Sequence, residues 1–94
     1  MITVTSSAVN HLRVLLGQKE ADPTSHGLRL GVERGGCAGM QYTMKVSEPE
    51  PTDQIIEAED LKFFIAEDSR EFLEGCELDF EDTLSFVGFR VNNP

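Results

Sequence analysis

The hydrophobic positions near the N-terminus recur at intervals of three or four residues, which is the spacing of one face of an α-helix. The positions on this face are Ala8, Val9, Leu12, Leu15 and Leu16. Thr5 or Ser6 can cap the first turn, so the pattern predicts a helix over residues 7–18. The polar residues 20–27 then predict a linker rich in turns.

From residue 28 onward, the hydrophobic period changes from helical spacing to two. Segments 28–34 and 40–46 alternate apolar and polar residues, and together they predict a β-hairpin around the glycine-rich stretch between them. Further strands are predicted at residues 55–57, 61–65, 77–81 and 84–91. Residues 67–73 predict one or two helical turns. The pattern therefore indicates a mainly β (β-rich α+β) domain with an N-terminal helix, a short second helix and two packed layers.

The length of 94 residues predicts one domain over residues 1–94. The first residues lack a basic flank followed by a long apolar run, so we expect neither a signal peptide nor a membrane span. Cys37 and Cys76, which are far apart in the sequence, do not form a disulfide framework. This cysteine usage predicts a reducing, cytoplasmic location.

The formal net charge of −9, from 17 acidic and 8 basic residues, argues against binding to nucleic acid or to anionic membranes. Residues 48–82 hold 14 of the acidic residues and only two basic ones, Lys62 and Arg70. This segment predicts either a solvated, acidic face or a docking surface for a basic partner.

Cys37 is the candidate for chemistry, because it lies in the stretch ERGGCAGMQY, residues 33–42. Gly35, Gly36 and Gly39 allow positive φ angles and a close approach of backbone amides, which favour a thiolate or a metal-bound sulfide. The alternative is a glycine-rich hairpin turn in which Cys37 is a small filler. These residues alone leave both interpretations open.

The stretch GLRLGVERGGCAGMQY, residues 27–42, resembles the signature of the A-type iron–sulfur carriers, the HesB/IscA family. Residues 2–16 resemble the first strand and helix of that family, and residues 72–94 resemble its later segment, which ends in Asn-Pro. The resemblance covers nearly the whole chain. It implies a HesB-like fold, a two-layer β-sandwich or open barrel of short strands.

The same resemblance implies a function in iron–sulfur cluster assembly. Such a protein binds iron or a [2Fe–2S] or [4Fe–4S] cluster and delivers it to apo-proteins, and its partners are apo iron–sulfur proteins and the assembly machinery. Cys37 matches the first cysteine ligand of the family, with Gly35, Gly36 and Gly39 around it. The cluster is expected between subunits of a homodimer or larger homo-oligomer. No motif supplies a histidine base for Cys37, so we do not expect an enzyme.

The chain departs from the family pattern after Pro94, where family members continue into a tail with a Cys-Gly-Cys pair. A [2Fe–2S] cluster needs four ligands, and one Cys37 per chain gives a dimer only two. Three explanations remain: a tail in the natural protein, which we favour, weak or absent binding without it, or a contribution from Cys76.

We expect Cys76 to serve as a small apolar residue, although it is also a candidate for an auxiliary metal ligand. A zinc site formed by the two cysteines with His11 and His26 has no supporting spacing. The alternative function for the chain is a cluster-free, β-rich protein-interaction module that keeps the fold without the ligand set.

Overall fold

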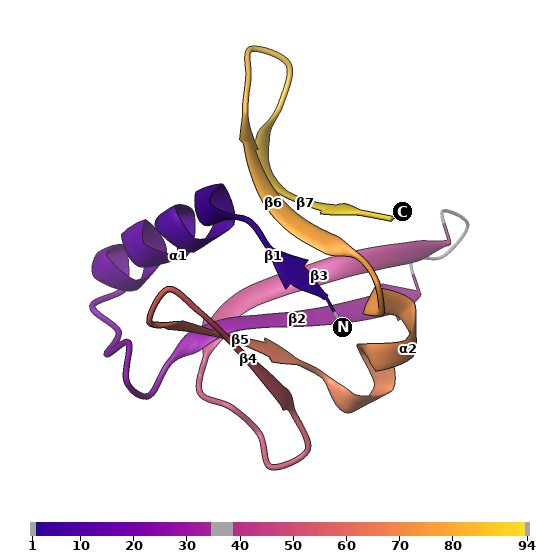
Figure 1. The fold of residues 1–94 in the computed structure, drawn as a ribbon, viewed down its shortest axis with the longest axis horizontal. Coiled ribbons are helices and arrows are strands. Elements are labelled where there is room, and N and C mark those ends of the chain that lie inside the picture. Colours follow the sequence, from indigo (N-terminus) through magenta and orange to yellow (C-terminus); the bar gives the residue numbers. More distant parts are fainter. Residues whose placement is uncertain (1, 35–38, 94) are drawn as a thin grey trace.

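The computed structural model describes residues 2–34 and 39–93 (Figure 1). In these ranges the elements are, in order, β1 (Thr3–Val4), α1 (Ser6–Gln18), β2 (Gly27–Arg34), β3 (Met40–Ser47), β4 (Gln54–Ala58), β5 (Leu61–Ile65), the 3₁₀ turn η2 (Glu67–Ser69), α2 (Arg70–Leu73), β6 (Glu77–Asp82) and β7 (Val87–Asn92). The predicted mainly β fold, with an N-terminal helix and a short second helix, is confirmed.

Helix α1 begins at Ser6, one residue before the predicted start, and Thr5, one of the two predicted caps, caps its first turn. The Thr5 Oγ1 atom accepts a hydrogen bond from the backbone N–H of Ala8 at 3.2 Å. The apolar face of the helix is buried, whereas Val14 lies on the other side and is about half exposed. Neither α1 nor α2, the helices in the described part of the chain, is long and apolar enough to cross a membrane.

The larger sheet has four strands in the order β3-β2-β5-β4. Strands β2 and β3 pair in antiparallel fashion over their full length, from Gly27 opposite Ser47 to Arg34 opposite Met40. Strand β5 lies parallel to β2 on its other side and forms a hairpin with β4. The predicted hairpin of segments 28–34 and 40–46 is therefore confirmed.

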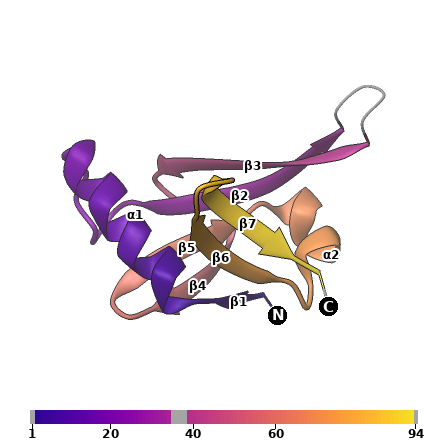
Figure 2. The ribbon, with the colours of Figure 1, turned by 90° about the horizontal axis from the view of Figure 1, so that it is seen from above.

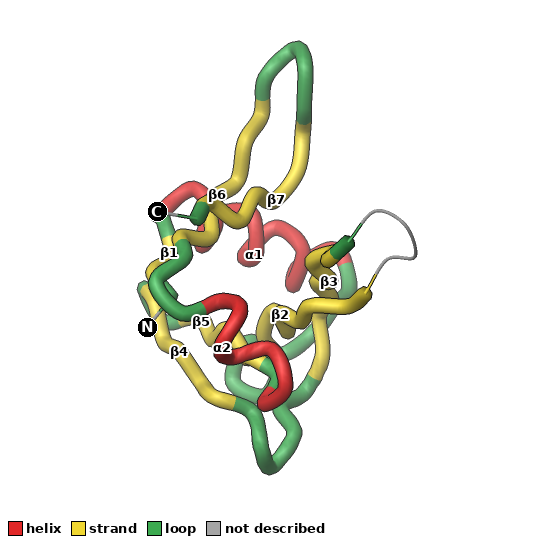
Figure 3. The backbone as a smooth tube through the Cα atoms, turned by 90° about the vertical axis from the view of Figure 1, so that its right-hand side faces the viewer, coloured by secondary structure: helices red, strands yellow, loops and turns green. Residues whose placement is uncertain are grey.

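The smaller sheet has three strands in the order β1-β6-β7, with β1 parallel to β6 and β7 antiparallel to it. Figures 1 and 3 show the β6–β7 hairpin projecting away from the rest of the chain. The strand predicted at residues 84–91 was placed too early. The Thr83 Oγ1 atom accepts hydrogen bonds from the backbone N–H groups of Ser85 and Phe86, which forms a turn, so β7 begins only at Val87.

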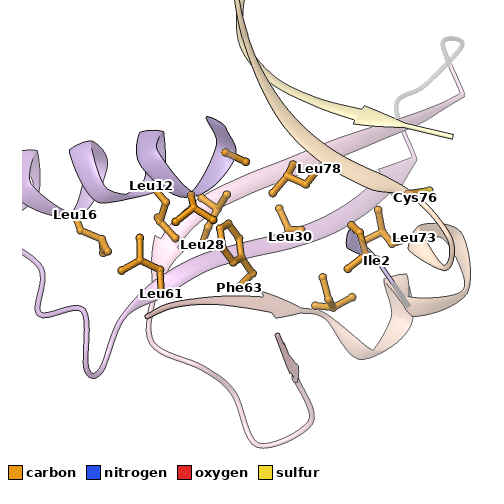
Figure 4. Packing of buried hydrophobic residues seen from close by; sticks show 13 residues of the cluster. Ile2, Leu12, Leu16, Leu28, Leu30, Leu61, Phe63, Leu73, Cys76 and Leu78 are labelled. Atoms are coloured by element: carbon orange, nitrogen blue, oxygen red, sulfur yellow. The ribbon is translucent and has the colours of Figure 1, made fainter. Parts of the chain in front are cut away.

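The core lies between the two sheets and α1 (Figure 4). Its buried residues are Ile2, Ala8, Val9, Leu12, Leu16, Leu28, Leu30, Leu61, Phe63, Ile65, Leu73, Cys76 and Leu78. Because both sheets contribute to one cluster, the predicted two-layer arrangement is confirmed. The sheets do not close into a barrel, since β3 and β7 are each the outer strand of their sheet.

Most of the acidic residues in segment 48–82 are exposed to solvent, but the Asp53 side chain is not. Its carboxylate is buried and forms an ion pair with Arg29 of β2. Arg29 also contacts the Glu50 carboxylate at 3.0 Å, and the Glu50 backbone N–H donates to Asp53 at 2.9 Å. This cluster fastens the loop between β3 and β4 to the larger sheet.

Candidate functional site

The end of the β2–β3 hairpin brackets the glycine-rich stretch that the sequence singles out. Gly35, Gly36 and Cys37 lie outside the described residues, so their expected roles stay predictions. Gly39 has a φ of +83°, a value that residues with a side chain rarely adopt, although an added Cβ would meet no atom of the described residues within 4 Å. Glycine is therefore favoured at position 39 by backbone conformation and not by lack of space.

Cys76 lies just before β6, at the end of the hydrophobic core beside Ile2 and Leu73 (Figure 4). Its side chain is fully buried. The thiol donates a hydrogen bond to Asn93 Oδ1 at 2.8 Å and lies 3.6 Å from the backbone oxygen of Phe72. This position agrees with the interpretation of Cys76 as a small core residue. Its distance from Cys37 involves residues outside the described ranges.

Asn93 extends this contact to the other sheet. Its Nδ2 atom donates a hydrogen bond to the Tyr42 hydroxyl of β3 at 3.4 Å. Figures 1 and 2 show the C-terminal end of β7 and the ends of β2 and β3 on the same side of the molecule, whereas Figure 3, seen from that side, shows them apart. A hydrogen-bonded chain from Cys76 through Asn93 to Tyr42 joins the two sheets.

An open groove of about 600 Å³ follows the seam between β3 and β7. It is lined by Gln41, Tyr42, Met44, Phe89, Arg90 and Val91. Tyr42 thus belongs both to this groove and to the contact with Asn93, and its side chain is partly exposed. The seam is the place where the two sheets remain separate.

The two histidines lie in different environments. The His11 ring stacks on Phe80 with a centroid distance of 3.8 Å and meets the edge of Phe89. The Nδ1 atom of His26 lies 2.8 Å from Ser25 Oγ in the linker after α1. Within residues 2–34 and 39–93, no group of three or more His, Cys, Asp or Glu side chains is arranged to hold a metal ion.

The family model described as iron–sulphur cluster biosynthesis matches residues 1–94. The chain belongs to this iron–sulphur cluster biosynthesis family. The family resemblance that the glycine-rich signature predicts is thereby confirmed.

Individual relatives agree with this membership. The vegetative HesB protein of Trichormus variabilis is 35% identical over 96 residues, covering 99% of this chain and 78% of the relative. The protein named iron-binding protein IscA from Escherichia coli is 36% identical over 94 residues, covering 99% and 85%. A crystal structure of IscA with the [2Fe–2S] cluster matches with a TM-score of 0.85 and 28% identity, covering 100% of this chain and 86% of that one. The HesB-like fold is confirmed.

The chain of contacts through Asn93 is the part of the candidate site that the sequence did not predict. Asn93 and Tyr42 are separated by 51 positions, and Cys76 lies between them in the sequence. Periodicity identifies elements but not which distant side chains meet. The only signal in the sequence is the Asn-Pro pair at residues 93–94, which belongs to the family resemblance and does not identify the partners of Asn93.

Proposed function

We propose that this family member is an A-type carrier, which binds iron or a [2Fe–2S] or [4Fe–4S] cluster through Cys37 and delivers it to apo-proteins. The observation that carries the proposal is the match of the cluster biosynthesis family over residues 1–94. The likeness to the protein named iron-binding IscA, and to the IscA structure with its [2Fe–2S] cluster, supports it further.

The chemistry of the donor atoms agrees with a carrier. A cysteine thiolate binds iron strongly, and a thiolate in an accessible loop can be exchanged when the cluster moves to a recipient. Gly39, with its positive φ, permits backbone geometries that residues with side chains disfavour. Cys76 is buried and donates to Asn93, which leaves Cys37 as the candidate ligand between the two cysteines.

The ligand count favours a cluster shared between copies of the chain. A [2Fe–2S] cluster takes four ligands, so one loop thiolate per chain favours a homodimer or a larger homo-oligomer. Exposed apolar side chains at the turn between β6 and β7, Leu84, Phe86 and Val87, add surface that favours association. The other partners we propose are apo iron–sulfur proteins and the assembly machinery, in the cytoplasm.

We propose a carrier and not a catalyst, because thiol catalysis needs a histidine or another base positioned beside the sulfur. His11 stacks on Phe80 and meets the edge of Phe89, and His26 is hydrogen-bonded to Ser25 in the linker. Within the described residues, both histidines therefore already have contacts of their own.

Anaerobic reconstitution with ferrous iron and sulfide tests the proposal. The parent protein should develop visible sulfur-to-iron charge-transfer absorption and should pass its cluster to an apo [2Fe–2S] ferredoxin. Cys37→Ser should remove most of the absorption, whereas the matched variant Cys76→Ser should keep it. Equal iron uptake by Cys37→Ser and the parent would overturn the assignment of Cys37. Failure of the parent to take up iron would favour the cluster-free interaction module.

A further inference from the structure

We propose that Cys76, Asn93 and Tyr42 form a clamp that holds the end of β7 against β3 and so positions the iron-binding end of the protein. In this inference Cys76 is a positioning residue and not an iron ligand. The existence of the clamp is independent of iron, and only its effect on iron binding rests on the proposed function.

The fixed end of the clamp is Cys76. Its backbone N–H donates to the Leu73 carbonyl at 3.1 Å, and its own carbonyl accepts from the Thr3 N–H at 2.9 Å. The residue is therefore held by the end of α2 on one side and by β1 on the other. Because its side chain is also fully buried, the direction of the S–H donor is set by the core.

The middle of the clamp is the Asn93 amide. An asparagine side chain carries an acceptor oxygen and a donor NH₂ group at a fixed angle to each other. The thiol of Cys76 occupies the oxygen at 2.8 Å, which directs the NH₂ group to the Tyr42 hydroxyl at 3.4 Å. Hydrogen bonds in such a chain polarise one another, so the loss of either one weakens the other.

The location of the clamp gives it a role in the site. Tyr42 lies two residues after Met40, the residue of β3 that pairs with Arg34 at the end of the hairpin. Cys37 precedes Met40 by three residues in the sequence. The clamp thus attaches the end of β7 to Tyr42, which follows the Cys37 stretch by only a few residues along the chain. We infer that it restrains the end of β7 relative to this stretch, as outer contacts orient the ligands of other metal sites.

Intrinsic fluorescence is a direct probe of the clamp, because Tyr42 is the single tyrosine of the chain and the chain has no tryptophan. Tyrosine fluorescence of the apo-protein therefore reports on Tyr42 alone. Asn93→Ala and Cys76→Ala should change the emission and make it more accessible to iodide quenching. Cys76→Ser retains a donor and should restore behaviour close to that of the parent. Asn93 is exposed, so its replacement leaves the core packing intact.

Leu16→Ala is the matched control, since Leu16 is buried on α1 and has no part in the clamp. It should lower the free energy of unfolding and leave the Tyr42 emission unchanged. Parent-like Tyr42 emission and quenching in Asn93→Ala would overturn the clamp, whether or not the protein binds iron.

Iron titration of the same variants tests the positioning role. Asn93→Ala and Cys76→Ala should lose iron affinity by about tenfold at most, because about tenfold is the smallest loss typical of removing a residue that contacts a metal ligand directly. Cys76→Ser and Leu16→Ala should bind as the parent does. Unchanged iron affinity in a variant with altered Tyr42 emission would overturn the positioning role. Loss of iron by Cys76→Ser with parent-like emission would overturn it too, because Cys76 would then be a ligand.

Discussion

At the scale of single residues, Asp53 shows how burial determines the contribution of an ion pair to stability. Asp53 and Glu50 both contact Arg29, but the Asp53 side chain is 0% exposed and that of Glu50 is 63% exposed. An exposed ion pair is screened by water and contributes little to stability. A buried pair costs desolvation to form, and removing one partner leaves the other charge poorly compensated.

We therefore expect Asp53→Ala to lower the free energy of unfolding by about 3 kcal/mol, because Arg29 loses its buried partner. The matched variant Glu50→Ala should cost less than about 1 kcal/mol. Urea denaturation followed by circular dichroism measures both values. Equal losses in the two variants would contradict the assignment of the stabilising contact to Asp53.

Asp22 is a surface carboxylate whose pKa is lowered by local hydrogen bonds. The backbone N–H of Thr24, at 2.9 Å, and then the Thr24 hydroxyl, at 2.8 Å, hold the pKa of this carboxyl below its usual value of 3.8. A lowered pKa contributes stability that is fully present above the unfolded pKa and is lost as the pH falls through the folded pKa.

We expect the Asp22 carboxyl to titrate below pH 3.8 in the folded protein, as followed by NMR. Thr24→Val keeps the backbone N–H but removes the hydroxyl, so its titration midpoint should lie closer to 3.8 than that of the parent. Thr24→Ser retains a hydroxyl and should titrate as the parent does. A parent midpoint at or above 3.8 would show that these hydrogen bonds do not persist in solution.

At the scale of elements, the β4–β5 hairpin has a turn that its sequence does not favour. Ala58 pairs with Leu61, which leaves Glu59 and Asp60 as a two-residue loop. Both loop residues have positive φ, +48° and +74°. Such turns strongly prefer asparagine and glycine, since other residues are strained in the left-handed region.

Asp60→Gly should raise the free energy of unfolding by about 0.5 kcal/mol, since relief of the φ strain exceeds the added flexibility of the unfolded chain. Asp60→Ala keeps the positive φ, which alanine tolerates less well than aspartate, and it should cost about 1 kcal/mol. Thermal unfolding of the parent and the two variants gives the order of their stabilities. A parent that is more stable than Asp60→Gly would refute the strained turn.

The elements also show which features of the fold a sequence can reveal. Helix α1 and the β2–β3 hairpin were predictable, because their apolar periods and the Thr5 cap are local signals. The start of β7 was not predictable from the apolar period. The Thr83 hydroxyl accepts hydrogen bonds from two backbone N–H groups, so residues whose apolar pattern is that of a strand form a turn. The parallel pairing of β1 with β6 joins distant segments, and no local pattern encodes it.

In the candidate site, too, local features were predictable from the sequence and long-range contacts were not. The glycine-rich stretch and Cys37 were identified from residue types within a few positions of one another. The family match over residues 1–94 confirms the family resemblance, and the role of Cys37 stays a prediction. The contacts of Cys76 with Asn93, and of Asn93 with Tyr42, depend on how the two sheets are placed together. A single sequence shows residue types and their spacing, but it does not show which distant side chains come into contact.

At the scale of the whole molecule, net charge and ligand count act in opposite directions on association. Each chain carries a formal charge of −9, so two copies repel each other, and the repulsion weakens as salt screens it. A [2Fe–2S] cluster, by contrast, needs more thiolates than one Cys37 provides, and its binding favours a second copy. Cluster loading should therefore shift the protein towards larger species.

Sedimentation velocity of the apo and reconstituted proteins in thiol-free buffer measures this shift. We expect the loaded protein to sediment as a dimer or a larger species, with visible cluster absorption in the same boundary, because a cluster bridged by Cys37 thiolates ties chains together. Added salt should strengthen association of the apo-protein by screening its acidic surface. Cys37→Ser carried through the same reconstitution should keep the apo distribution, which separates cluster-driven assembly from a general effect of iron and sulfide. A loaded species that remains strictly monomeric would rule out a shared cluster.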